Sequence, residues 1–167
     1  MQPAQGWVAL MAAELSKTHP KIKVINASIS GETTSGGLTR LPALISRHQP
    51  KYIVLQLAAN DGLRGLPLKQ IEKNITGLIS LSQKSKAKVL LAGVRLPTNY
   101  GPRYTQKFYN IFEKLATQYT TFRVPFLMEN VALNPDLMQG DRLHPNARAQ
   151  PIVLNNVMPY LQTMLDE

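Results

Sequence analysis

The sequence predicts an α/β fold, a three-layer α/β/α sandwich in which helices cover both faces of a parallel sheet. Strand-like and helix-like segments alternate along the chain, which is the order that produces parallel sheets. Residues 51–57 and 88–94 are nearly continuous aliphatic runs, which is typical of strands covered on both faces. At 167 residues the chain has the length of one domain. We therefore expect a single domain over residues 1–167.

Helices are predicted where apolar residues recur at a spacing of three and four. The segments with this spacing are residues 4–17, 38–48, 67–82, 104–118 and 147–165. Prolines mark several of their limits. Pro20 ends the first helix and Pro67 opens the third, because the residue before a proline disfavours helical geometry. We expect Pro42 in the first turns of the second helix, and Pro151 and Pro159 to shorten or kink the last one.

Four segments are predicted to be strands: residues 21–27, 51–57, 88–94 and 122–126. In the first, Ile22 and Val24 alternate with lysines, which indicates partial exposure or an edge position. Strands joined by helical crossovers lie parallel and right-handed, in a flavodoxin-like arrangement. The loops that follow their carboxyl ends are therefore expected to meet at one edge of the sheet.

The composition is that of an ordinary globular protein, with 44% hydrophobic and 17% charged residues. No apolar run has the length of a membrane span, and we recognise no signal peptide in the chain as it stands. The absence of cysteine excludes disulfides, thiolate metal sites and a cysteine nucleophile. No metal-binding pattern is present, and we expect no cofactor.

The net charge of +9 permits two interpretations. A basic protein attracts anionic partners such as nucleic acid, phospholipid surfaces or acidic thioesters. Alternatively, the basic residues form a solvated surface. Their densest group, residues 84–88, precedes a predicted strand, and no basic stripe with interleaved aromatics is present. We favour the solvated surface and expect no nucleic-acid partner.

One motif near the carboxyl end combines a histidine with a carboxylate. Asp141 precedes His144 by three positions, and Pro145 keeps the histidine out of helical geometry. An aspartate that holds one imidazole nitrogen leaves the other free to act as a general base. A loop histidine beside an aspartate is more commonly a surface pair or a helix cap, so this motif alone decides nothing.

Three further stretches accompany this motif: NASISGET at residues 26–33, LAANDGLRG at 57–65 and RLPTNYG at 95–101. In this order, the four blocks resemble the SGNH hydrolases, also called the GDSL esterase family, over residues from about 7 to 161. The resemblance implies acyl transfer to a serine, without metal or cofactor. It implies small-molecule substrates such as acyl esters, acyl-CoA thioesters and lysophospholipids. It also implies a monomer in a periplasmic or secreted location.

The resemblance assigns a role to individual residues. Asp141 would orient His144, the general base and acid. The backbone N–H of Gly31 and the side-chain amide of Asn60 would form the oxyanion hole. The preceding Ala58-Ala59 departs from the Gly-x-Asn-Asp pattern of the family, so a Cβ at the first position could narrow the site or shift the asparagine.

Substrate-binding residues are also implied by the resemblance. The loop that would cover the acyl chain comprises Gly62, Leu63, Arg64, Gly65 and Leu66. Its two glycines would give the loop freedom to change conformation on binding. Leu96, in the loop after the third predicted strand, is expected to contact the acyl chain.

The Gly-Asp-Ser-Leu block that carries the nucleophile in this family does not occur in the sequence. In the family, that block ends a central strand between the strands expected at 21–27 and 51–57. We therefore expect an N-terminally truncated hydrolase that is inactive, or nearly so, as this chain. The alternatives are a non-catalytic acyl- or lipid-binding pseudo-hydrolase, a substitute nucleophile among Ser28, Ser30 and Ser35, and a basic nucleic-acid-binding module.

Overall fold

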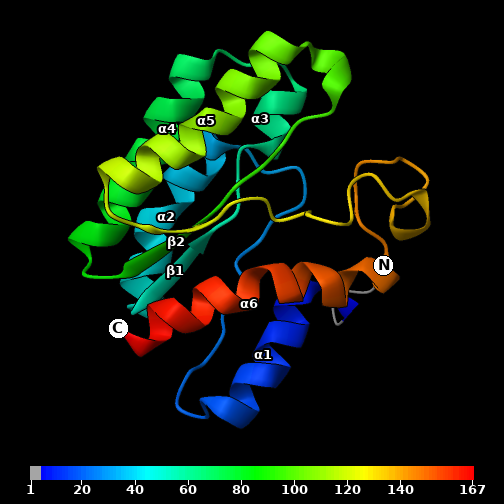
Figure 1. The fold of residues 1–167 in the computed structure, drawn as a ribbon. Coiled ribbons are helices and arrows are strands. Elements are labelled where there is room, and N and C mark those ends of the chain that lie inside the picture. Colours follow the sequence, from blue (N-terminus) through cyan, green and yellow to red (C-terminus); the bar gives the residue numbers. More distant parts are fainter. Residues whose placement is uncertain (1–4) are drawn as a thin grey trace.

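The computed structural model describes residues 5–167 and contains a parallel sheet of three strands in the order β1-β2-β3 (Figure 1). The strands are β1 (Tyr52–Leu55), β2 (Lys88–Ala92) and β3 (Phe122–Val124). β2 is central and pairs in parallel with both neighbours; Leu55 lies opposite Leu91 on one side, and Leu90 lies opposite Phe122 on the other. β1 is therefore an edge strand of this sheet.

Helices cover both faces of the sheet. Their bounds are α1 (Trp7–Thr18), α2 (Thr34–His48), α3 (Ala59–Leu63), α4 (Leu68–Lys84), α5 (Pro102–Gln118) and α6 (Gln150–Asp166). Short 3₁₀ turns occur at η2 (Thr98–Tyr100), η3 (Pro135–Leu137) and η4 (Ala147–Ala149). α1 packs against α6 on one face, and α2 packs against α4, with α5 beside them, on the other. The three-layer sandwich is thus confirmed.

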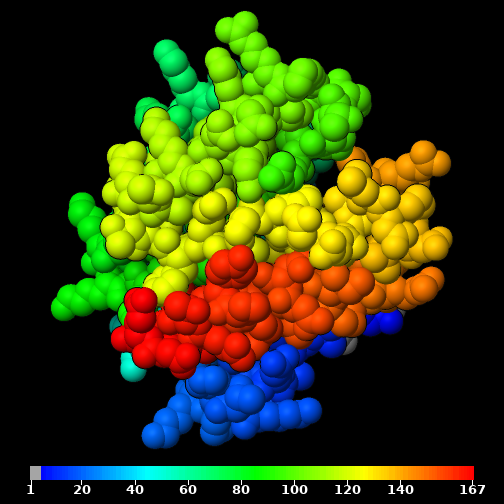
Figure 2. Space-filling view, in the orientation of Figure 1, coloured from blue at the N-terminus to red at the C-terminus, as the bar shows by residue number. Residues whose placement is uncertain are grey.

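Two hydrophobic cores lie on either side of the sheet. Successive residues of a strand point to opposite faces, so Leu91 joins the core formed with α2, α4 and α5, while Leu90 joins the core formed with α1 and α6. Both leucines are buried. Figure 2 shows α6, in red, lying across the middle of the molecule with α1, in blue, beneath it.

The segment predicted as a strand at residues 21–27 has no regular secondary structure and pairs with no strand among the described residues, so this prediction is wrong. Ile25 is 43% exposed. The alternating sequence fits an extended conformation, but a strand also needs a neighbour that can accept its hydrogen bonds. The remaining three predicted strands form, each ending two residues before its predicted limit.

Several helix limits differ from the predicted ones for local reasons. α2 begins at Thr34 rather than at residue 38, because the Thr33 side chain accepts a hydrogen bond from the Gly36 N–H and caps the helix. Pro42 consequently lies inside α2 and not in its first turns. α6 continues through Pro159, while Pro151 lies in its first turn. The predicted start of the first helix at Ala4 lies outside the described residues.

Within residues 5–167, none of the helices combines the length and the apolar character needed to cross a membrane.

Candidate active site

The histidine–aspartate pair predicted from sequence is formed in the loop before α6. The Nδ1 atom of His144 lies 2.7 Å from Oδ2 of Asp141. The other carboxylate oxygen, Oδ1, accepts hydrogen bonds from the backbone N–H of Leu143 at 2.9 Å and of His144 at 3.0 Å. The histidine side chain is 64% exposed. Asp141 therefore fixes the imidazole through one nitrogen and leaves Nε2 directed away from the carboxylate.

These contacts set the protonation state of Asp141. The hydrogen bond with the His144 side chain, followed by those from the Leu143 and His144 backbones, lowers the pKa of Asp141 from 3.8 to about 2. The carboxylate is therefore ionised at neutral pH. An ionised partner favours a proton on Nδ1 and stabilises the imidazolium that forms when Nε2 accepts a proton.

The loop that carries the pair is held at both ends. Asn146 caps the η4 turn with its side-chain oxygen, and its amide group donates to the Asp136 carbonyl at 2.8 Å. Gln150 at the start of α6 accepts a hydrogen bond from the Trp7 N–H at 2.9 Å. The beginning of α1 thus lies beside the end of this loop (Figure 1).

Gly31 and Asn60, the two predicted oxyanion donors, lie in neighbouring segments. The Nδ2 of Asn60 donates to the Glu32 carbonyl at 2.9 Å, which uses one of its two hydrogens and leaves the second available. Gly31 has φ of +75° and no atom lies within 4 Å of a Cβ built on it. Its backbone is therefore open to approach by a ligand.

A buried polar network supports this pair and was not predicted from sequence. Asp61 is 1% exposed and Thr34 is fully buried. Thr34 donates to the Asp61 carboxylate from both its backbone N–H and its hydroxyl, and Asn74 of α4 donates to the Thr34 hydroxyl at 2.9 Å. The network joins the start of α2 to α3, the helix that contains Asn60.

Arg40 of α2 forms a second set of contacts that was not predicted from sequence. These contacts hold the segment that contains Gly31. Glu32 forms an ion pair with Arg40 at 2.8 Å. The Arg40 guanidinium also donates two hydrogen bonds to the Ala27 carbonyl at 3.2 Å. The partners are 8 and 13 positions apart, which is why neither contact follows from local sequence patterns.

Ala58 adopts a left-handed conformation with φ of +82° and is fully buried. A residue with a Cβ is disfavoured in this region, by roughly 1–2 kcal/mol. Glycine meets this requirement without cost, in agreement with the family pattern in which a glycine precedes Asn-Asp. Asn60 itself lies in the first turn of α3.

The predicted substrate loop packs against Leu96. A Cβ on Gly62 would meet the Leu96 side chain at 2.6 Å and that of Phe108 at 2.9 Å, so Gly62 allows a close contact. Leu96 is 7% exposed. The hydroxyl of Tyr100 donates to the Leu63 carbonyl and that of Tyr104 to the Leu66 carbonyl, each at 2.8 Å. Two tyrosines therefore hold the loop in its present conformation.

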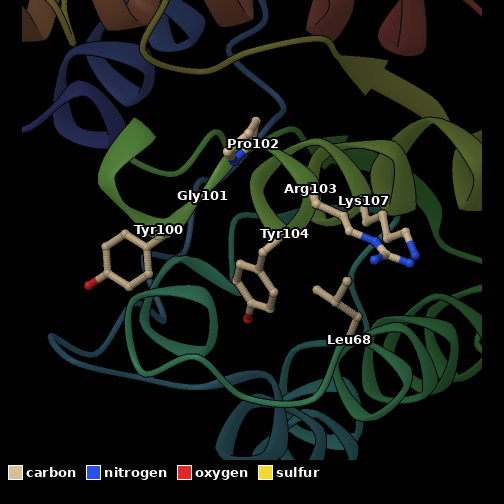
Figure 3. Close-up of a pocket in the computed structure, with 7 residues that line it drawn as sticks. All are labelled: Leu68, Tyr100, Gly101, Pro102, Arg103, Tyr104 and Lys107. Atoms are coloured by element: carbon tan, nitrogen blue, oxygen red, sulfur yellow. The ribbon is translucent and has the colours of Figure 1, made fainter.

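A shallow pocket of about 420 Å³ adjoins this loop (Figure 3). Its walls are formed by Leu68, Tyr100, Gly101, Pro102, Arg103, Tyr104 and Lys107. Arg103 and Lys107 are exposed and lie one turn apart on α5. The sequence analysis did not single out these two cations, because nothing in their spacing distinguishes them from other surface residues.

Comparison with known proteins identifies the family of the chain. Residues 2–151 match the model of the GDSL-like lipase/acylhydrolase family. The chain belongs to this family. The resemblance to SGNH/GDSL hydrolases drawn from the sequence blocks is confirmed, together with the fold that it implied.

Two named proteins match nearly all of the chain. Esterase TesA of Pseudomonas aeruginosa is 43% identical over 165 residues, which are 99% of this chain and 82% of that protein. Thioesterase 1/protease 1/lysophospholipase L1 of Escherichia coli K12 is 40% identical over 166 residues, covering 99% and 78% respectively. A crystal structure of TesA superposes with a TM-score of 0.95 at 43% identity, covering 98% of this chain and 91% of that chain.

Proposed function

We propose that this GDSL-like acylhydrolase site hydrolyses acyl esters and thioesters by transfer of the acyl group to a serine. The observation that carries the proposal is the Asp141–His144 pair, with 2.7 Å between the carboxylate and Nδ1. A general base needs one free nitrogen and a fixed orientation. The exposed imidazole, bound to Asp141 through Nδ1 alone, meets both requirements.

His144 and Asp141 would carry out the proton transfers of the reaction. Nε2 of His144 accepts the proton of the serine hydroxyl as the oxygen attacks the acyl carbon. The same nitrogen then donates this proton to the leaving alcohol or thiol. Water repeats the sequence on the acyl-enzyme and releases the acid. Asp141 stays ionised throughout and stabilises the imidazolium.

The negative charge of the tetrahedral intermediate requires hydrogen-bond donors. The second hydrogen on Nδ2 of Asn60 and the N–H of Gly31 supply them. Both belong to segments fixed by the Glu32 carbonyl and the Asp61–Thr34 contacts. Donors that are already oriented stabilise the developing charge without reorganisation.

The nucleophile is the one part that these residues do not provide. Ser28, Ser30 and Ser35 lie in the 26–35 region, and no hydrogen bond joins any of them to His144 in the described part of the chain. We infer that hydrolysis requires a serine on a further segment and that the 167 residues alone have little or no activity.

The relatives and the loop support this choice of substrate class. Proteins named esterase, thioesterase and lysophospholipase match nearly the whole chain. Leu63 and Leu66 of the predicted loop pack against the same core as Leu96, and we propose that this apolar cluster meets the acyl chain. Arg103 and Lys107 beside this cluster would favour substrates that carry phosphate, such as acyl-CoA and lysophospholipids.

The test joins a strand ending in Gly-Asp-Ser-Leu ahead of residue 1 and measures hydrolysis of p-nitrophenyl butyrate. We expect activity in this fusion, a loss of about 10³-fold or more in His144→Ala, and a loss of about 10²–10³-fold in kcat in Asn60→Ala. His19→Ala, a change immediately after the carboxyl end of α1, is the matched control and should retain activity. A folded fusion without activity would contradict the proposal.

A second candidate function is acyl or lipid binding without turnover. The observation in its favour is an apolar groove of about 710 Å³ beside β1. Binding of sodium decanoate by the 167-residue chain, together with a fusion protein that hydrolyses no ester or thioester, would favour this alternative.

A further inference from the structure

The guanidinium of Arg95 lies against two aromatic rings near the carboxyl edge of the sheet. Its Cζ atom is 3.9 Å from the centroid of the Tyr109 ring on α5 and 5.7 Å from that of Phe126, which follows β3. Arg95 is exposed, while both rings are half-buried. A cation over the face of an aromatic ring is attracted by the quadrupole of the ring. The two rings therefore restrict the positions that this charged group can take.

The Arg95 side chain has no polar partner in the part of the chain that the structure describes. No hydrogen bond or ion pair between residues 5 and 167 involves its guanidinium. Glu113, one turn after Tyr109 on α5, lies 3.8 Å from the Arg123 guanidinium instead. An arginine presents its N–H donors in a fixed planar fork. All the donors of this fork are therefore available to a ligand.

The sheet topology places Arg95 on the same edge as the candidate active site. The three strands are parallel, so Asn60 after β1, Arg95 after β2 and Phe126 after β3 follow the same ends of their strands. The Leu127 N–H donates to the Gly93 carbonyl at 3.1 Å, which keeps the last two loops together beyond the strands. Ligands of open α/β sheets bind outside the carboxyl ends of the strands. Arg95 thus lies where a bound substrate can extend.

The contacts of Arg95 favour the binding of an oxyanion. The planar fork of an arginine pairs with two oxygens of a phosphate or a carboxylate. An exposed arginine ordinarily loses side-chain freedom when it binds, and this loss opposes association. Tyr109 and Phe126 already restrict the Arg95 side chain, so less freedom remains to be lost. The net charge of +9 adds a field that attracts anions.

Among oxyanions, a phosphate monoester fits this surroundings best. Its charge at pH 7 is about −1.5 to −2, whereas a carboxylate or a phosphate diester carries a single negative charge. Coulomb attraction grows in proportion to the charge. A monoester is therefore expected to bind more tightly to an unpaired guanidinium in a basic protein.

We propose that Arg95, held by Tyr109 and Phe126, binds the phosphate monoester group of a substrate at the edge of the candidate active site. The acyl part of this substrate would lie toward Leu96, the next residue in the chain. Assigning the phosphate to an acyl substrate rests on the proposed function; the binding of phosphate by Arg95 does not. Two kinds of acyl compound carry such a group: acyl-CoA has a 3′-phosphate, and lysophosphatidate has a terminal phosphate.

This site is separate from the pocket that contains Arg103 and Lys107 (Figure 3). Lys107 and Tyr109 are two positions apart on α5, and residues with this spacing do not face each other on a helix. Arg95 does not line that pocket. A variant of Arg95 therefore tests this site without altering the other one.

The test measures binding to the 167-residue chain by ¹⁵N NMR at constant ionic strength. The probes are sn-glycerol 3-phosphate, which represents a lipid headgroup, and adenosine 3′-monophosphate, which represents the 3′-phosphate of coenzyme A. We expect a saturable shift of the Arg95 Nε–H signal and of the backbone N–H signals of residues 94–96. Acetate and glycerophosphocholine, each with a single negative charge, should bind about threefold more weakly or worse.

Two pairs of variants separate the stacked fork from general charge. Arg95→Gln should weaken binding of either monoester about tenfold or more. Arg47→Gln removes the same charge from the exposed end of α2 and should leave binding unchanged. Tyr109→Leu should weaken binding about two- to fivefold, which corresponds to about 0.5–1 kcal/mol for a cation–π contact at an exposed site. Tyr109→Phe keeps the ring and should bind like the parent.

The outcomes that would overturn the proposal are specific. Equal weakening by Arg95→Gln and Arg47→Gln would show attraction to the overall charge and not a site. Acetate or glycerophosphocholine that binds as tightly as the monoesters would reject the ligand class. If the site holds, tighter binding of adenosine 3′-monophosphate would indicate acyl-CoA, and tighter binding of sn-glycerol 3-phosphate would indicate a phospholipid.

Hydrolysis of uncharged p-nitrophenyl butyrate by the fusion protein keeps this inference distinct from the proposed function. An active fusion, together with no phosphate binding at Arg95, would support the proposed function and overturn the inference. Phosphate binding at Arg95, together with a folded and inactive fusion, would support the binding site and contradict the proposed function.

Discussion

At the scale of single residues, hydrogen bonds within a four-residue motif keep the Asp141 carboxylate ionised. Its pKa is lowered to about 2, mainly by the His144 side chain and then by two backbone N–H groups. A lowered pKa means that the folded state favours the ionised carboxylate. The stabilisation is therefore complete above pH 3.8 and is lost as the pH falls through about 2.

We predict that His144→Ala raises the pKa of Asp141 from about 2 toward 3.8, because it removes the largest cause of the shift. The increase should be partial, since the two backbone hydrogen bonds remain. Carbon-13 NMR of the Asp141 carboxyl group, followed against pH, measures the midpoint. His48→Ala should leave it unchanged. An unaltered midpoint in His144→Ala would show that the pair does not form in solution.

A second residue-scale prediction concerns Thr34, whose hydroxyl donates to buried Asp61 and accepts from Asn74. Thr34→Val removes this hydroxyl and leaves a buried carboxylate and a buried amide short of partners. We expect a loss of about 2–4 kcal/mol in the free energy of unfolding, measured with urea.

The matched control is Thr39→Val, at an exposed position of the same helix where the hydroxyl bonds only to the Ser35 carbonyl. This change should stay within about 0.5 kcal/mol. Equal losses in the two variants would contradict the importance assigned to the buried network.

At the scale of elements, the backbone of Gly93, just after β2, lies very close to the backbone of Val124 and Pro125 at the end of β3. Gly93 follows β2, and a Cβ at this position would lie 2.1 Å from the Pro125 carbonyl oxygen. The Gly93 N–H also donates to the Val124 carbonyl at 2.8 Å, and the Gly93 carbonyl accepts from the Leu127 N–H. These contacts direct the chain from β2 toward Leu96.

We predict that Gly93→Ala destabilises the protein by about 1–3 kcal/mol, because backbone atoms must move to admit the Cβ. Chemical denaturation measures the loss, and hydrogen exchange should show faster opening at the ends of β2 and β3. Gly140→Ala is the control, since nothing lies within 4 Å of a Cβ there. A Gly93→Ala protein as stable as the parent would exclude the close approach.

At the scale of the whole molecule, the central strand β2 connects two separate cores. Leu90 contributes to the core with α1 and α6, and Leu91 to the core with α2, α4 and α5. A substitution at either of these two neighbouring positions therefore affects the packing on a different face of the sheet.

We predict that Leu90→Ala and Leu91→Ala each cost about 2–5 kcal/mol but loosen different layers. Hydrogen exchange should accelerate mainly in α1 and α6 for the first variant and in α4 and α5 for the second. The same pattern of exchange in both variants would show a single cooperative core.

The sequence alone determined whatever depends on near neighbours. Periodic apolar residues and prolines identified the main helices and three strands, because these signals act within a few residues. The Asp141–His144 pair was also predictable, since its partners are three positions apart. The block order was enough to indicate the family.

Tertiary structure decided what depends on distant partners. Residues 22–27 have a strand-like sequence but pair with no strand of the described sheet, so they have no regular secondary structure. The support of Asn60 and Gly31 by Thr34, Asp61 and Asn74 joins residues 27 and 40 positions apart. Local propensity carries no information about such contacts, because they form only when the layers of the sandwich pack together.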